Sequence, residues 1–209
     1  MKRKYSAFTL EEAMQLVPAD NFVPWELSAP PRAASDRLLD ILRRRESFDI
    51  QTSEVAKALI IDDMLTEIVP NHPTLKVWKG APLVTDRFTG VVDYLFTPQM
   101  AFVSTPLLCI VEAKRDDFVR GRAQCVAEMV ACVWKNEQEG HVSDVFGIVS
   151  NGRNWQFYKL TTTGDLHEST LYSRNSLDGL LGALDYVCGE CAKLTPPPSH
   201  RAGCISVVD

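Results

Sequence analysis

The strongest constraint on the fold of this chain comes from two short apolar segments that carry charged residues. Residues 90–96 contain Asp93, and residues 107–114 contain Glu112 and Lys114. Apolar runs of this length predict buried strands, in which an isolated charge is costly. In Glu-Ala-Lys the two charged residues are two apart, so they share one face of a strand. The sequence therefore predicts two neighbouring strands whose charged side chains need partners, water or a metal.

A carboxylate from each of two neighbouring strands, with a lysine beside them, makes a compact site for a hard divalent cation. Carboxylate, carbonyl and water oxygens are the ligands that Mg²⁺ and Mn²⁺ prefer. Metal ions of this kind assist phosphodiester hydrolysis, because they offset charge in the transition state and lower the pKa of a bound water. An alternative remains open at this stage: Asp93 and Glu112 could form ion pairs with Lys114 or Arg115 and hold no metal.

These residues resemble the PD-(D/E)xK nuclease superfamily, the restriction-endonuclease-like group, whose motif is an Asp on one strand and Glu-x-Lys on the next. Family members commonly carry a Glu on the helix before the sheet and a Gln on the helix after the motif. Glu54 and Gln124 stand at suitable places for these two residues. Residues 145–158 also look like the later strand pair in relatives of type I restriction subunits. The resemblance covers residues 53–160, about half of the chain.

The resemblance implies a metal site and a role for each matching residue. Asp93 and Glu112 would bind Mg²⁺ or Mn²⁺, and the carbonyl of Ala113 would add a third protein ligand. Lys114 would orient or deprotonate the attacking water, or stabilise the developing charge. The function expected is that of a divalent-metal-dependent nuclease, with DNA expected rather than RNA. A non-catalytic nucleic-acid-binding or assembly subunit with a nuclease-like fold is the alternative.

The two helix residues have weaker assignments. By resemblance, Glu54 would hold a metal-bound water or a second metal, and Gln124 would orient the site or contact a backbone phosphate. Glu54 could equally be a first-turn residue that compensates the helix dipole, and Gln124 an ordinary helix-surface residue. Both alternatives stay open on the sequence.

The order of the expected elements predicts an α/β fold with a central mixed β-sheet flanked by helices. The resemblance adds a restriction-endonuclease-like core. We expect an N-terminal helical extension at residues 1–51, a nuclease-like domain at 52–193 and a flexible tail at 194–209. Within the domain, helices are expected near 53–68, 116–136 and 177–193, and strands near 75–84, 90–96, 107–113, 144–150, 154–161 and 167–172.

The net charge of −5 does not indicate a nucleic-acid-binding protein, but a local basic surface matters more than the total. Two basic clusters are candidates. We interpret Arg37 and residues 43–45 as a solvated helix face, whereas Lys114, Arg115, Arg120 and Arg122 begin at the predicted site. No apolar run approaches the length of a membrane span, and no signal peptide is evident, so a cytoplasmic location without membrane association is expected. A homodimer or larger assembly is left open.

The six cysteines are expected to be reduced, small core residues. Cys188 and Cys191, followed by His200 and Cys204, could be drawn as a zinc site. We favour core packing, because the two cysteines continue the leucine stripe of the last helix, and the prolines at 196–198 separate them from the other pair.

Overall fold

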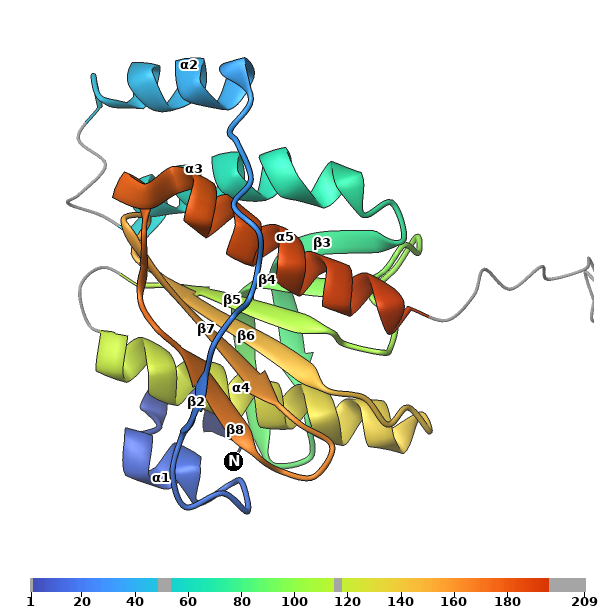
Figure 1. Cartoon of the computed structure of the whole chain (residues 1–209). Coiled ribbons are helices and arrows are strands. Elements are labelled where there is room, and N and C mark those ends of the chain that lie inside the picture. The colour runs from blue at the N-terminus through green and yellow to red at the C-terminus, as the bar shows by residue number, and fades with distance from the viewer. Residues whose placement is uncertain (1, 49–53, 115–117, 196–209) are drawn as a thin grey trace, which may run out of the picture.

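The chain folds into three layers, with a β-sheet between two layers of helices (Figure 1). This computed structural model describes residues 2–48, 54–114 and 118–195, and for Glu54 and Val55 the main chain alone. The predicted mixed sheet flanked by helices is confirmed. The helices are α1 (Leu10–Met14), α2 (Asp36–Arg45), α3 (Glu54–Ile68), α4 (Phe118–Gln138) and α5 (Leu177–Lys193), with 3₁₀ turns η1 (Tyr5–Ala7), η2 (Val69–Asn71) and η3 (Arg174–Ser176).

The sheet combines antiparallel and parallel pairs in the order β1-β4-β5-β6-β7-β8-β2, with β3 also beside β4 and β9 beside β7. The strands β3, β4 and β5 run antiparallel to one another, and β6 joins β5 in parallel after the α4 crossover. The strands are β1 (Arg3–Lys4), β2 (Val23–Trp25), β3 (Leu75–Val84), β4 (Phe88–Pro98), β5 (Cys109–Ala113), β6 (Val145–Ser150), β7 (Asn154–Leu160), β8 (Leu166–Ser169) and β9 (Tyr172–Ser173).

Each face of the sheet has its own apolar core. Side chains from α3 and α5 pack with one face, around residues such as Phe96 and Trp155. Side chains from α4, together with η1 and α1, pack with the other face, around residues such as Ile110 and Met129. Because both faces are covered, β5 and β6 are buried at every position, as their continuous apolar runs predict.

The N-terminal residues contribute strands as well as the predicted helices. Thr9 and Glu12 form the capping box that begins α1, and the Ser35 side chain accepts the Leu38 N–H at the start of α2. Strands β1 and β2 were not predicted, and they pair in parallel with β4 and β8. Strands of two and three residues carry no periodic pattern, so the sequence alone could not reveal them.

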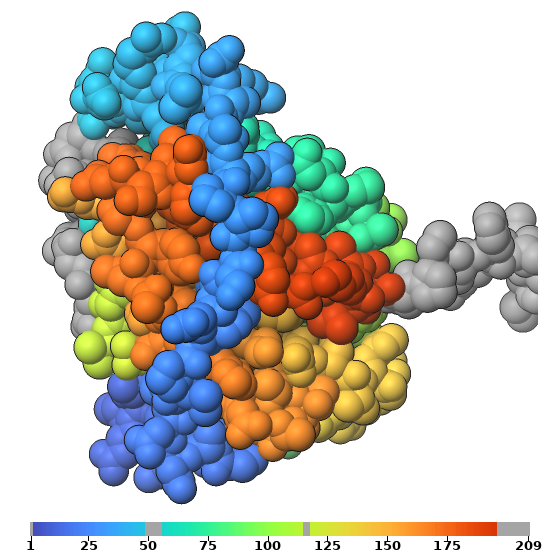
Figure 2. Space-filling view, viewed as in Figure 1, coloured from blue at the N-terminus to red at the C-terminus, as the bar shows by residue number. Residues whose placement is uncertain are grey.

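The segment at 26–35 crosses α5 on the outside of the molecule, in mid-blue over the red helix in Figure 2. The Arg32 N–H donates to the Asp178 carbonyl at 2.9 Å, and Arg32 Nη1 donates to Asp185 Oδ1 at 2.7 Å. His72 Nε2 lies 2.9 Å from the same oxygen. Gly182 allows the close approach, because a Cβ there would lie 2.3 Å from the carbonyl oxygen of Pro30.

The described cysteines are free and buried, which confirms the prediction that they are core residues. Cys188 and Cys191 belong to the apolar cluster beneath α5. His200 and Cys204 lie outside the described residues, as does nearly all of the predicted tail.

Candidate functional site

Asp93 lies where β4 bends and parts from β5. Tyr94 packs in the α3/α5 core, but Val92 packs in the core under α4, so the strand twists between them. Gly80, with φ of 66°, stands between the β3 residues that pair with Val92 and Tyr94. The left-handed conformation suits glycine and accommodates this twist.

The side chain of Asp93 takes the place of a backbone partner. The described pairing of β4 with β5 runs from Phe96–Cys109 to Tyr94–Val111. Beyond it, Asp93 Oδ2 accepts the N–H of Ala113 at 2.7 Å. This hydrogen bond fixes a carboxylate beside the end of β5, next to the predicted partner strand.

Glu112 and Lys114 meet at the end of β5, on the face covered by α4. Lys114 Nζ lies 2.5 Å from Glu112 Oε1, so the two side chains share one face as predicted. Glu112 is only 1% exposed. Burial raises the pKa of Glu112 to about 7, the charge of Asp93 raises it further, and Lys114 opposes both effects.

Gln124 and a second buried glutamate line the same region from α4. Gln124 and Glu128 are one helical turn apart, and Gln124 Nε2 donates to Glu128 Oε1 at 2.9 Å. Glu128 is 0% exposed. Burial and the charge of Glu112 both raise the pKa of Glu128 well above its usual range. The alternative that Gln124 is an ordinary surface residue is wrong, because it is buried.

Glu128 is the site residue that sequence reasoning missed. A usable signal was present, since Glu128 follows Gln124 by four residues and lies next to Met129, a predicted core position. A glutamate at i+4 from an inward-facing residue shares its helix face. Because glutamate is almost never fully buried unless it is paired, the usual expectation places it on the surface.

The two glutamates face each other without a donor between them. Their carboxyl groups are close enough to form a hydrogen bond. As ionised carboxylates, however, both can only accept, and within the described residues no donor reaches Glu112 Oε2 or Glu128 Oε2. Asp93, Glu112 and Glu128 thus place three carboxyl groups around the ammonium of Lys114.

This donor set fits a hard cation bound largely by water and substrate. Excess negative charge and a buried carboxylate oxygen without a donor are both relieved by a cation. Within residues 2–48, 54–114 and 118–195, no group of three or more His, Cys, Asp or Glu side chains is arranged to hold one metal ion. The protein would therefore supply two carboxylates and the Ala113 carbonyl, which suits Mg²⁺ because Mg²⁺ usually keeps several waters.

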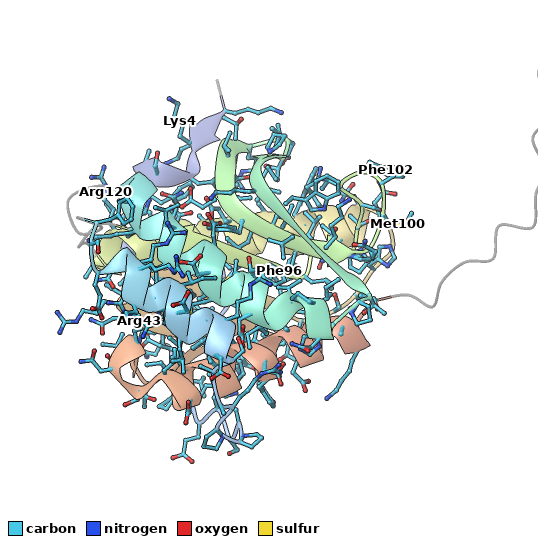
Figure 3. All side chains as sticks on the ribbon, turned by 90° about the horizontal axis from the view of Figure 1, so that it is seen from above. Lys4, Arg43, Phe96, Met100, Phe102 and Arg120 are labelled. Atoms are coloured by element: carbon cyan, nitrogen blue, oxygen red, sulfur yellow. The ribbon has the colours of Figure 1, made fainter. Side chains whose placement is uncertain are left out.

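The basic residues divide between internal pairs and an exposed position. Arg43 and Arg44 both bond to Asp40 at 2.6 and 2.7 Å on an exposed helix face, which agrees with their interpretation as solvated. Arg122 pairs with Glu168 at 2.8 Å. Arg120 is exposed on the first turn of α4, at the end of the molecule opposite Met100 and Phe102 (Figure 3).

Two predicted site features cannot be placed. Glu54 is the first residue of α3, but its side chain lies outside the described part of the chain. Arg115 also lies outside it. Their roles stay predictions.

Comparison with known proteins assigns no relative. No protein-family model matches the chain, and no curated protein matches its sequence. In the part of the chain that the structure describes, no helix has both the length and the apolar character needed to cross a membrane.

Proposed function

We propose that this protein is a divalent-metal-dependent nuclease that hydrolyses phosphodiester bonds, with DNA as its substrate. The observation that carries the proposal is the meeting of Asp93, Glu112 and Lys114 where β4 and β5 part. The succession of helix, antiparallel strands, helix and parallel strand also supports it, since the PD-(D/E)xK resemblance implies an order of this kind. The preference for DNA comes from the resemblance alone.

Each residue of the site has a chemical task in this proposal. Asp93 and Glu112 hold Mg²⁺ or Mn²⁺, with the Ala113 carbonyl as third ligand. The metal, when bound, neutralises charge on the phosphate and lowers the pKa of a water molecule. Lys114, held by Glu112 at 2.5 Å, orients that water or stabilises the charge that develops.

The entrance to the site also favours an anion. Gly121 on the first turn of α4 lies against Lys114, because a Cβ on Gly121 would be 2.8 Å from Lys114 Cγ. The N-terminal end of α4, with its positive partial charge, is therefore next to the lysine. Arg120 on the same turn is exposed and adds a cation near the site. A phosphate backbone entering here would meet both.

The proposal predicts that Glu112→Gln and Lys114→Ala abolish cleavage while leaving the fold intact. We expect a loss of about 100-fold or more, since each variant removes a metal ligand or a group that acts on the water. Nicking of supercoiled plasmid and degradation of single-stranded DNA, each in Mg²⁺, Mn²⁺ or EDTA, measure it. Asp86→Ala, in the exposed turn between β3 and β4, is the matched control and should cleave like wild type.

Wild-type-like cleavage by either site variant would refute the assignment of this site. Absence of cleavage by wild-type protein in every metal would instead favour the non-catalytic nucleic-acid-binding alternative. Circular dichroism and thermal unfolding of each variant separate loss of chemistry from loss of fold.

A further inference from the structure

The contact between Glu112 and Glu128 cannot be a contact between two ions. Both side chains are almost completely buried, at 1% and 0% exposure. Two ionised carboxylates in contact at this depth would carry like charges out of water with no donor between them. A proton on one of the two facing oxygens removes the repulsion and turns the contact into a hydrogen bond.

Gln124 indicates which oxygen of Glu128 would carry that proton. Gln124 Nε2 donates to Glu128 Oε1 at 2.9 Å, so Oε1 already acts as an acceptor. Glu128 Oε2 has no donor among the described residues, and neither has Glu112 Oε2. Glu112 Oε1 accepts from Lys114. The arrangement is complete when Glu128 Oε2 donates to Glu112 Oε2.

We propose that Glu128 is a neutral carboxylic acid that donates a hydrogen bond from Oε2 to Glu112 Oε2 and thereby positions Glu112 as a metal ligand. This inference rests on the proposed function. Glu128 is a positioning residue in this account, since it acts through Glu112 and contacts neither metal nor substrate. With Glu128 neutral, Asp93, Glu112 and Lys114 leave one net negative charge to meet the divalent cation.

The alternative role for Glu128 is that of a direct metal ligand. That role disagrees with the geometry, because no three acidic side chains in the described chain are arranged around one metal position. The Gln124 contact also turns Oε1 of Glu128 toward α4. Positioning residues behind a metal ligand typically change metal affinity or activity by about 10- to 100-fold when they are removed.

The test compares Glu128→Gln, which keeps a neutral donor of the same shape, with Glu128→Leu, which removes it. We expect Glu128→Gln to bind Mn²⁺ and cleave DNA within a few-fold of wild type, and Glu128→Leu to lose about 10-fold or more in both. Calorimetry with Mn²⁺ and plasmid nicking give the two readouts. Glu137→Gln, an exposed glutamate on the same helix, is the matched control.

Infrared spectroscopy provides a readout that needs neither metal nor activity. The metal-free wild-type protein at neutral pH should show the carbonyl band of a buried neutral carboxylic acid. The band should be lost in Glu128→Gln and retained in Glu137→Gln. This readout decides the inference even where Glu128→Leu does not fold.

Three results would overturn the inference. The first is Glu128→Gln that fails to bind Mn²⁺, which would make the charged carboxylate the required group. The second is a folded Glu128→Leu that matches wild type in both assays. The third is a wild-type infrared spectrum without the band. If wild-type protein binds Mn²⁺ but does not cleave, the nuclease proposal fails while the role of Glu128 is still decided by binding and by the band.

Discussion

At the scale of single residues, Asp93 combines a structural and a proposed chemical role. Its Oδ2 satisfies the Ala113 N–H that would otherwise lack a strand partner, at 2.7 Å. The same carboxylate is close enough to Glu112 to raise its pKa. A neutral amide at position 93 could still accept the hydrogen bond, but it would lack the charge that binds a cation. Structure and metal binding can therefore be separated at this position.

Glu12 gives a pH-dependent prediction at the same scale. The Arg3 side chain, with the Thr9 N–H at 2.9 Å, lowers the pKa of Glu12 from 4.5 to about 2. A carboxyl whose folded-state pKa is lowered adds stability above its unfolded value, and this is lost as the pH falls through the folded value. Glu12→Gln should therefore lower the melting temperature at pH 7, with the difference shrinking between about pH 4.5 and 2.

Thermal unfolding of both proteins across this pH range measures the effect. Glu11→Gln, the exposed neighbour, is the control and should change the melting temperature less. A melting-temperature difference for Glu12→Gln that stays constant down to pH 2 would show that the ionised contact with Arg3 is not its source.

At the scale of elements, the packing of α4 on β6 places Gln124 and Glu128 against the sheet. Gly147 in the middle of β6 lets the helix approach, because a Cβ there would meet Met129 Sδ at 2.5 Å and Cys125 Sγ at 2.7 Å. These two sulfur atoms are on the same helix as the buried glutamate. The distance between helix and strand is thus set by the absence of one side chain.

Gly147→Ala should destabilise the protein by about 1–3 kcal/mol, the usual cost of overpacking a filled core. Chemical denaturation measures the free energy of unfolding. Gly179→Ala is the control, since a Cβ on Gly179 in α5 meets no atom within 4 Å. There the substitution should be neutral or stabilise by up to about 1 kcal/mol. Equal effects at the two glycines would contradict this account of the packing.

The elements with a strong periodic or apolar signal could be predicted from the sequence. Helix α5 spans the predicted residues, and β3, β6 and β7 lie within one residue of their predicted bounds. Three charges on two apolar strands also predicted the meeting of Asp93, Glu112 and Lys114. Glu128 could not be found in this way, because the need to bury it depends on Glu112, which is 16 residues away in sequence and on a different element.

At the scale of the whole molecule, the N-terminal residues belong to the same sheet as the site. Strand β1 pairs with β4 near its start, at Phe88 and Thr89, and β2 pairs with β8 at the other side of the sheet. The segment at 26–35 then crosses α5. These pairings link distant parts of the sequence, and no local pattern announces them. We infer that residues 2–45 stabilise the strand that carries Asp93.

Calorimetric titration of Mn²⁺ into wild-type protein and Asp93→Asn tests the central claim most directly, with Asp86→Asn as control. The account predicts one Mn²⁺ per chain for wild type and for Asp86→Asn. It predicts no measurable binding for Asp93→Asn, although the amide keeps the hydrogen bond to Ala113 and the fold. Failure of wild-type protein to bind Mn²⁺, or equal binding by a folded Asp93→Asn, would contradict the claim that these carboxylates form a metal site.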